Sequence, residues 1–206
     1  MTRSAPRKDC DIACVVLAAG GSRRLGRPKQ LVRHRGRTLL QNAVKAARGA
    51  LPDAPLIVVV GADALRIRLV LRRARCRAQV AQNAGWAQGM ATSLGVGLAA
   101  LPRSARAALV LLVDQPHVDA AALERLVAAW RRRPRRPAAA RYDGRVGVPA
   151  VLPRANWRAL KSSRGDEGAR ALLRGAAALT LVDMPEAALD IDTPADAQQL
   201  LRAPRL

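Results

Sequence analysis

The residues best suited to chemistry lie in a glycine-rich segment near the N-terminus. It reads Ala18-Ala-Gly20-Gly21-Ser-Arg23-Arg24-Leu-Gly26-Arg-Pro28-Lys29. Adjacent glycines let backbone N–H groups approach a phosphate chain, and Arg and Lys supply the opposing charge. Neither GxGxxG nor a Walker A loop is present, because Arg27-Pro28-Lys29 follows Gly26 where Walker A needs Lys and then Ser or Thr. The segment predicts a triphosphate site, and the alternative is an ordinary glycine turn with exposed cations.

Apolar runs of strand length alternate with segments of helical periodicity around this loop. The strand-like runs are Ile12–Ala18, Leu56–Val60, Arg77–Ala81, Ala107–Val113 and Ala178–Val182. The helix-like segments are Leu39–Ala50, Ala64–Arg73, Met90–Leu101 and Ala120–Arg131. Such alternation predicts an α/β fold with a doubly wound, mostly parallel, Rossmann-like sheet.

The pattern changes after Arg131. A basic, proline-containing stretch, residues 131–137, is interpreted as a solvated connection. Ala138–Arg141 and Val148–Leu152 then flank a turn and predict a small C-terminal β insertion. We further expect a strand into Leu189–Asp192 and a helix from Thr193, with Thr193 as N-cap and Asp196 completing a capping box. The whole chain, residues 1–206, is predicted to be a single domain with a disordered N-terminal segment, residues 1–11.

Asp114 is the carboxylate most suited to bind a metal. It directly follows the apolar run Ala107–Val113, so it should emerge at the same edge of the sheet as the glycine-rich loop, where ligands of open α/β folds bind. Helix capping is the alternative role for an aspartate here, but Asp119 is better placed to cap the helix from Ala120. We therefore expect Asp114 to hold Mg²⁺, with Mn²⁺ as the alternative ion; Mg²⁺ prefers oxygen ligands.

Composition and charge narrow the class of protein. The chain has 206 residues, no Phe, and 36 Lys and Arg against 15 Asp and Glu, for a formal net charge of +21. The arginines are spread along the chain, and aromatic residues for base stacking are scarce, so a nucleic-acid-binding protein is the less favoured interpretation. Three cysteines without metal or disulfide spacing fit a reducing cytoplasm. No run reaches the roughly 18 apolar residues of a membrane span.

Ordered motifs resemble those of one family along nearly the whole chain. The glycine-rich segment reads Leu17-Ala-Ala-Gly-x-Ser-x-Arg-x-Gly-x-x-Lys29-x-Leu31. The others follow in family order: Asn83-Ala-Gly-Trp86-x-x-Gly89-Met90-x-x-Ser93-Leu94, Val113-Asp114-Gln115-Pro116, Gly147-x-Pro149-Ala150, Gly165-Asp166-x-Gly168-Ala169-Arg170 and Asp190-Ile-Asp192-Thr193-Pro194. Together they resemble the MobA-like nucleotidyltransferase superfamily, and within it the molybdenum cofactor cytidylyltransferases. With Ala19, the sequence resembles the cytidylyl branch at this position, because the related guanylyltransferases usually carry Gly there.

The resemblance implies a set of site residues. Those implied for catalysis are Arg23, Lys29 and Asp114, and those for the metal are Asp114 and Asp192, with Asp190 as a supporting or merely solvated group. Those implied for the nucleotide are Leu17, Ala18, Ala19, Gly20, Gly21, Ser22, Asn83, Gly89 and Ser93, although Asn83, Gly89 and Ser93 each also suit a turn, a helix entrance or packing. Those implied for the acceptor substrate are Gly147, Pro149, Asp166 and Arg170.

The implied activity is transfer of CMP from CTP to molybdopterin with release of pyrophosphate. An acceptor phosphate is mostly ionised at neutral pH, with a second pKa of about 6, so such a reaction needs no catalytic base. That agrees with a chain that has only two histidines, His34 and His117. The resemblance also implies a cytoplasmic protein whose partners are CTP, the molybdopterin-type cofactor, and a molybdenum hydroxylase or its maturation chaperone, with no specific nucleic acid and no membrane. Another base or acceptor is the alternative.

Overall fold

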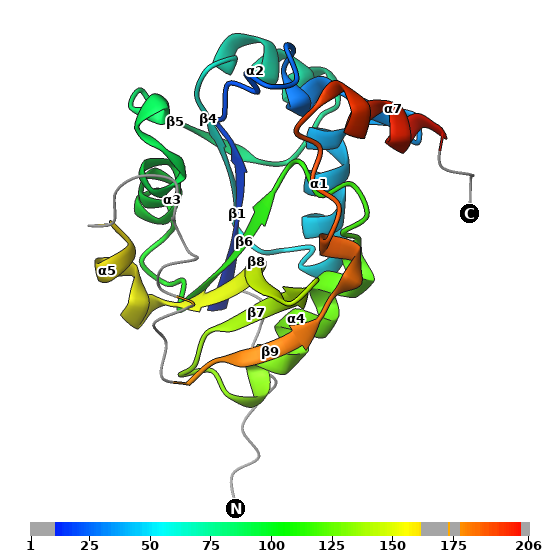
Figure 1. Ribbon diagram of the computed structural model, residues 1–206. Coiled ribbons are helices and arrows are strands. Elements are labelled where there is room, and N and C mark those ends of the chain that lie inside the picture. The colour runs from blue at the N-terminus through cyan, green and yellow to red at the C-terminus, as the bar shows by residue number, and fades with distance from the viewer. Residues whose placement is uncertain (1–10, 162–172, 174–177, 203–206) are drawn as a thin grey trace, which may run out of the picture.

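A seven-stranded mixed sheet forms the centre of the protein. The computed structural model describes residues 11–161, 173 and 178–202. In this part of the chain the strands lie in the order β5-β4-β1-β6-β8-β7-β9 (Figure 1). They are β1 (Ile12–Ala18), β4 (Leu56–Val60), β5 (Gln79–Gln82), β6 (Ala107–Leu112), β7 (Ala138–Tyr142), β8 (Arg145–Pro153) and β9 (Thr180–Asp183).

The parallel half of the sheet is the part that the sequence predicts best. Strands β1, β4, β5 and β6 run parallel. Every residue of β1 and of β4 is buried, because helices cover both faces, and such strands are continuous apolar runs rather than alternating ones. The predicted α/β class and the parallel sheet are confirmed.

Helices cover the two faces in separate groups. Helices α1 (Leu39–Ala50), α2 (Ala64–Arg73) and α4 (Ala120–Arg132) contribute to one core, whereas α3 (Met90–Ala99) and α5 (Trp157–Lys161) contribute to the other (Figure 1). Asp119 caps α4, since its Oδ1 accepts a hydrogen bond of 2.9 Å from the backbone N–H of Ala122. As expected, Asp119 rather than Asp114 caps this helix.

The predicted hairpin is present and joins the main sheet. Strands β7 and β8 pair antiparallel, and β8 pairs antiparallel with β6, with Val110 opposite Ala150. The turn lies at Asp143 and Gly144, both with positive φ. The edge strand β9 then adds parallel to β7. The hairpin and β9 thus extend the parallel sheet by three strands, and the insertion does not stand apart from it.

Other expectations need correction. Residues 189–192 form no strand in the structure; they lie in the connection that leads to α7 (Pro194–Arg202). The N–H of Ile191 donates to the carbonyl of Asp114 at 2.9 Å and so holds this connection at the sheet edge. A second, two-stranded sheet of β2 (Arg33–His34) and β3 (Arg37–Thr38) is present that the sequence pattern does not predict. Strand β5 begins two residues later than expected, at Gln79.

The ends of the chain are described only in part. Residues 1–10 of the segment expected to be disordered lie outside the described residues, and Asp11 already accepts a hydrogen bond of 2.8 Å from the N–H of Arg106. Within the described ranges, no helix is both long enough and apolar enough to cross a membrane.

Helix α3 packs unusually close to the sheet at Gly97. A Cβ at this position would lie 2.5 Å from Cγ1 of Val15 and 3.0 Å from Cγ2 of Val59. Both valines belong to fully buried central strands, so neither can move aside easily. Glycine is required here to let α3 sit directly on β1 and β4.

We expect Gly97→Ala to lower the free energy of unfolding by about 1–3 kcal/mol, the usual cost of overpacking a core. Urea denaturation measures this change. The control is Val15→Ala, which removes the methyl that a Cβ at residue 97 would meet. If the contact is the cause, the double variant is destabilised by less than the two single losses combined; strict additivity would contradict the explanation.

Candidate active site

A pocket of about 320 Å³ lies at the carboxyl edge of β1 and β6. It is lined by Leu17, Ala18, Ala19, Gly20, Gly21, Arg23, Lys29, Gln30, Trp86, Ala87, Gly89, Met90, Ser93, Leu112, Val113 and Asp114. The structure thus brings together the glycine-rich loop, both expected cations and the expected metal ligand. Ser22 lies beside them and not among the described lining residues; its Oγ accepts the backbone N–H of Lys29 at 3.0 Å, which closes the loop onto itself.

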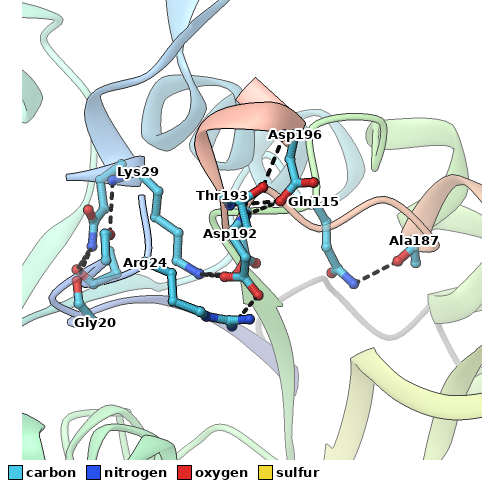
Figure 2. A network of polar contacts seen from close by, with 12 residues as sticks. Gly20, Arg24, Lys29, Gln115, Ala187, Asp192, Thr193 and Asp196 are labelled. Carbon is cyan, nitrogen blue, oxygen red and sulfur yellow. Dashed lines mark hydrogen bonds and ion pairs between the residues drawn. The ribbon is translucent and has the colours of Figure 1, made fainter. Parts of the chain in front are cut away.

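Lys29 lies between two carboxylates at the centre of the site. Its Nζ donates to Oδ2 of Asp114 at 2.5 Å. It also donates to Oδ1 of Asp192 at 2.9 Å (Figure 2). The side chains of Lys29 and Asp114 are only 16% and 11% exposed. Arg24, which is mostly exposed, donates to the other oxygen of Asp192 at 2.7 Å. The glycine-rich loop and the C-terminal segment are therefore joined by a charged cluster.

The charges of this cluster stabilise one another. Burial alone lowers the pKa of Lys29, but the attraction and hydrogen bonds of Asp114 and Asp192 outweigh burial and raise that pKa above its ordinary value. Burial likewise opposes ionisation of Asp192, but Lys29 and then Arg24 hold the pKa of this carboxyl below its ordinary value. Lys29 and Asp192 are therefore both charged at neutral pH.

Backbone hydrogen bonds fix the position of Asp192. The N–H of Ile191 donates to the carbonyl of Asp114, which sets the two acidic segments side by side. Oδ2 of Asp196 accepts from the N–H groups of Asp192 and Thr193, while Oγ1 of Thr193 accepts from the N–H of Asp196 (Figure 2). This is the predicted capping box, and it fixes the turn that carries Asp192.

Gln115 fastens the same region from the other side. It is buried, and its Nε2 donates to the carbonyls of Val148 at 3.1 Å and Ala187 at 3.0 Å. One side chain therefore links the loop after β6, strand β8 and the connection that leads to Asp192.

The carboxylates fit a hard divalent cation. Oδ1 of Asp114 is buried and has no hydrogen-bond partner among the described residues, so an oxygen ligand is left for another group. Within those residues, no group of three or more His, Cys, Asp or Glu could hold a metal. Asp114 and Asp192 therefore suit an ion that takes few protein ligands and completes its shell with water and phosphate oxygens, as Mg²⁺ does.

Gln30 holds the glycine-rich loop in shape. It is fully buried, and its Nε2 donates to the carbonyls of Ala18 and Gly20, each at 2.9 Å. Because the N–H and C=O of a trans peptide point in opposite directions, these two peptide units direct their N–H groups away from Gln30. The clamp thus fixes the direction of the loop amides before any ligand binds.

The two adjacent glycines of the loop have different surroundings. A Cβ at Gly21 would lie 2.9 Å from Cζ3 of Trp86, so Gly21 is needed for the indole to pack against the loop. A Cβ at Gly20 would have nothing within 4 Å, because the backbone there borders open space. Gly20 therefore leaves room for a ligand to approach the main chain.

Asn83, Gly89 and Ser93, which the family resemblance implies for the nucleotide and its base, divide into two groups. Gly89 and Ser93 line the pocket at the start of α3. Asn83 is buried beneath it: Nδ2 donates to the hydroxyls of Thr92 and Ser93, each at 2.9 Å, and Oδ1 accepts the N–H of Gly85. Its amide orders the segment that reaches the pocket, and direct contact with a base stays a prediction.

The predicted acceptor residues lie on β8 or outside the described residues. Gly147 and Pro149 are buried in β8, next to Val148, whose carbonyl receives the amide of Gln115. They adjoin the loop that carries Asp114, and their role toward an acceptor stays a prediction. Asp166 and Arg170 lie outside the described residues.

The sequence identifies most residues of the site but does not show which ion pairs and hydrogen bonds they form. The sequence places Arg24 with the loop cations, but only the structure shows that it, rather than Arg23, pairs with Asp192. Trp86 and Gln115 are part of the recognised motifs, but the sequence assigns neither of them a role. Gln30, beside the predicted catalytic lysine, gives no signal of its own, because burial of its amide depends on segments that are distant in sequence.

Comparisons with known proteins agree with this geometry. Residues 14–186 match a family described as the MobA-like NTP transferase domain. Nicotine blue oxidoreductase of Paenarthrobacter nicotinovorans is 34% identical, over 94% of this chain and 99% of its own. A protein of Opitutus terrae named "Probable molybdenum cofactor guanylyltransferase" is 34% identical, over 82% of this chain and 79% of its own.

Solved structures of one protein are similar throughout. Rv0371c of Mycobacterium tuberculosis superposes with a TM-score of 0.81 at 33% identity, over 95% of this chain and all of the other. A structure of Rv0371c in complex with manganese gives a TM-score of 0.78 at 30% identity, over 94% of this chain and all of the other.

We expect substitution of Gln30 to weaken triphosphate binding. Gln30→Leu leaves two carbonyls without their donor, and Gln30→Glu places a carboxylate against them, so both variants should lose about tenfold or more in affinity, Gln30→Glu the more severely. Isothermal titration calorimetry with a magnesium nucleoside triphosphate measures the change. Gln41→Leu is the matched control: Gln41 serves the capping box of α1, so its loss should cost stability and leave affinity unchanged. Equal affinity of the Gln30 variants and the wild type would refute the clamp.

Proposed function

The chain belongs to the MobA-like NTP transferase family, and from this premise we propose that it transfers CMP from CTP to a molybdopterin-type cofactor, releasing pyrophosphate. One observation carries the proposal: a single pocket holds the glycine-rich loop, Arg23, Lys29 and Asp114 together. The acceptor class is supported by the Opitutus terrae relative, whose name refers to the molybdenum cofactor.

The proposed reaction is a direct displacement at phosphorus. An oxygen of the acceptor phosphate bonds to the α-phosphorus of CTP while the bond to the bridging oxygen of the β-phosphate breaks, and pyrophosphate takes the electron pair. The attacking oxygen carries no proton at neutral pH, so no general base is needed. The protein's part is to align the reactants and to stabilise the charge that develops on the phosphoryl oxygens, tasks suited to Arg23, Lys29 and the loop amides.

A divalent cation would be held by Asp114 and Asp192. When bound, Mg²⁺ or Mn²⁺ supplies positive charge to the phosphate oxygens. The orphan Oδ1 of Asp114 and the oxygen-only ligand set support this assignment. The manganese complex of the similar protein Rv0371c supports use of a divalent metal.

Ala19 supports cytosine as the base. It is almost fully buried and lines the pocket, and its carbonyl accepts the N–H of Ala62 at 3.1 Å, which fixes its position. In this proposal its methyl group narrows the pocket, whereas glycine would leave room for a larger purine. Guanylyl transfer is the second candidate, because the Opitutus terrae relative is named as a guanylyltransferase.

Use of the product is proposed from two relatives. Nicotine blue oxidoreductase and the purine catabolism protein PucB of Bacillus subtilis, which is 30% identical over 92% of this chain, bear names that refer to oxidation or purine breakdown. These names fit a product cofactor that is passed to a molybdenum hydroxylase or to its maturation chaperone.

The proposal predicts that CTP stabilises the protein more than GTP, ATP or UTP does. A ligand that binds only the native state raises the melting temperature, and at equal concentration a tighter ligand raises it more, so thermal unfolding with each magnesium triphosphate ranks the four bases. Transfer is then checked with α-³²P-labelled CTP and purified molybdopterin, which should yield a labelled dinucleotide and pyrophosphate. A larger shift with GTP would move the assignment to guanylyl transfer.

Ala19→Gly provides the matched variant for this ranking. Removing one methyl group should narrow the preference for CTP over GTP by about 10-fold, in the range for one methylene-sized difference in a pocket. The total affinity for the triphosphate moiety should change little, because the cations are untouched.

Asp114→Asn should lower the turnover rate by about 10²–10³-fold while the fold is kept. The amide retains the shape of the carboxylate but loses the charge that a metal needs. Pyrophosphate release measures the rate, and circular dichroism checks the fold. Asp119→Asn is the control, since an asparagine can still cap α4; near-normal turnover by Asp114→Asn would remove the metal role of this residue.

A further inference from the structure

The ion-paired side chains at the centre of the site carry balanced charge. Lys29 and Arg24 contribute two positive charges, and Asp114 and Asp192 contribute two negative charges, all joined by ion pairs of 2.5–2.9 Å. Arg23 in the pocket and Asp196 beside Asp192 add one further charge of each sign. A divalent cation added to this cluster would bring two positive charges into a partly buried space that has no surplus negative charge to balance them. Repulsion between such an ion and the Lys29 ammonium would be weakly screened there.

Lys29 also occupies the oxygen atoms that the ion would need. Its Nζ contacts one oxygen of each aspartate, the position of a cation shared by both carboxylates. Arg24 takes the second oxygen of Asp192. In the described part of the chain, only Oδ1 of Asp114 is left without a partner in this cluster, and one oxygen is a poor site for an ion that prefers six.

We infer that the site takes the divalent cation and the triphosphate as one unit, because the Lys29 ammonium stands between the two carboxylates where the cation would bind. A triphosphate offers Lys29 new oxygen partners and offers the cation additional ligands. Lys29 then turns from the carboxylates to the phosphate chain and releases Asp114 and Asp192 to the metal. Since the magnesium complex of a triphosphate is itself negatively charged, the exchange avoids a surplus of positive charge.

The consequence is thermodynamic coupling between the two ligands. Each should bind more tightly in the presence of the other, by the same factor. Lys29 thus has opposite effects: it disfavours the metal alone and favours the triphosphate. This inference rests on the proposed function only in taking a triphosphate as the ligand; the competition between Lys29 and the metal follows from the free site.

The test measures Mn²⁺ binding to the full-length, nucleotide-free protein by the electron paramagnetic resonance signal of the free aquo ion. We expect the Mn²⁺ affinity of Lys29→Met to be at least about tenfold higher than that of the wild type. In this variant Arg24 is the one cation left to balance the two carboxylates. The same variant should bind CTP more weakly. Equal Mn²⁺ affinity of the wild type and Lys29→Met overturns the inference.

Two variants test whether Lys29 blocks the metal position itself or only adds positive charge to the pocket. Arg23→Met removes one positive charge from the same pocket, and among the described residues no ion pair joins Arg23 to either carboxylate. Its Mn²⁺ affinity should stay near that of the wild type; a gain equal to that of Lys29→Met would contradict direct competition. Lys29→Met combined with Asp114→Asn should lose the gain, which locates the ion at this carboxylate pair.

A measurement on the wild type alone tests the coupling without any variant. Saturation with the α,β-methylene analogue of CTP should raise the affinity of the protein for Mn²⁺ about tenfold or more, after correction for the ion bound by the analogue itself. Analogue binding without any such increase overturns the coupling. If CTP and its analogue do not bind while Lys29→Met still gains Mn²⁺, the base assignment fails and the competition stands.

Discussion

The ion pairs of Lys29 with Asp114 and Asp192 are the constraint on which the site depends. They join residues that lie 85 and 163 positions apart in the sequence, so each partner comes from a different element of the fold. Lys29 follows the glycine-rich loop, Asp114 follows the central strand β6, and Asp192 precedes α7. Because the pairs are partly buried, a shift of any one element would leave a charge without its partner at a substantial cost in free energy. The loop, the sheet edge and the C-terminal segment must therefore keep a common geometry.

The aliphatic core supplies that geometry. With no Phe in the chain, shape complementarity comes from small residues that let helices approach the sheet closely, as Gly97 does on Val15 and Val59. Such packing leaves little freedom for strands β1 and β4 to slide, and the loop that follows β1 inherits their position. The polar clamps of Gln30 and Gln115 then transmit this order to the loop amides and to the turn that carries Asp192. Core and site are thus two parts of one arrangement.

Local pattern explains which parts of this arrangement could be predicted. Strands β1 and β4 and helices α1 and α2 have the expected bounds, since buried parallel strands and amphipathic helices are encoded in neighbouring residues. Asp114 could be placed because a residue that follows a central strand must reach the ligand edge of the sheet. The roles of Gln30 and the distinction between Arg23 and Arg24 could not, because they depend on which distant carbonyl or carboxylate a side chain meets. The expected strand at residues 189–192 failed for the same reason: no neighbouring strand in the described part of the chain pairs with it, and the segment instead hydrogen-bonds to the loop after β6.

The overall charge acts in the same direction as the balanced cluster. A net charge of +21 draws anions toward the surface and disfavours the approach of free divalent cations. At close range, Lys29 and Arg24 neutralise Asp114 and Asp192, so the free site offers little to a bare metal ion. Long-range field and local pairing therefore both favour an ion that arrives already bound to phosphate. A strongly basic protein can in this way use a divalent metal held by two carboxylates near its phosphate loop, because the substrate brings the remaining negative charge.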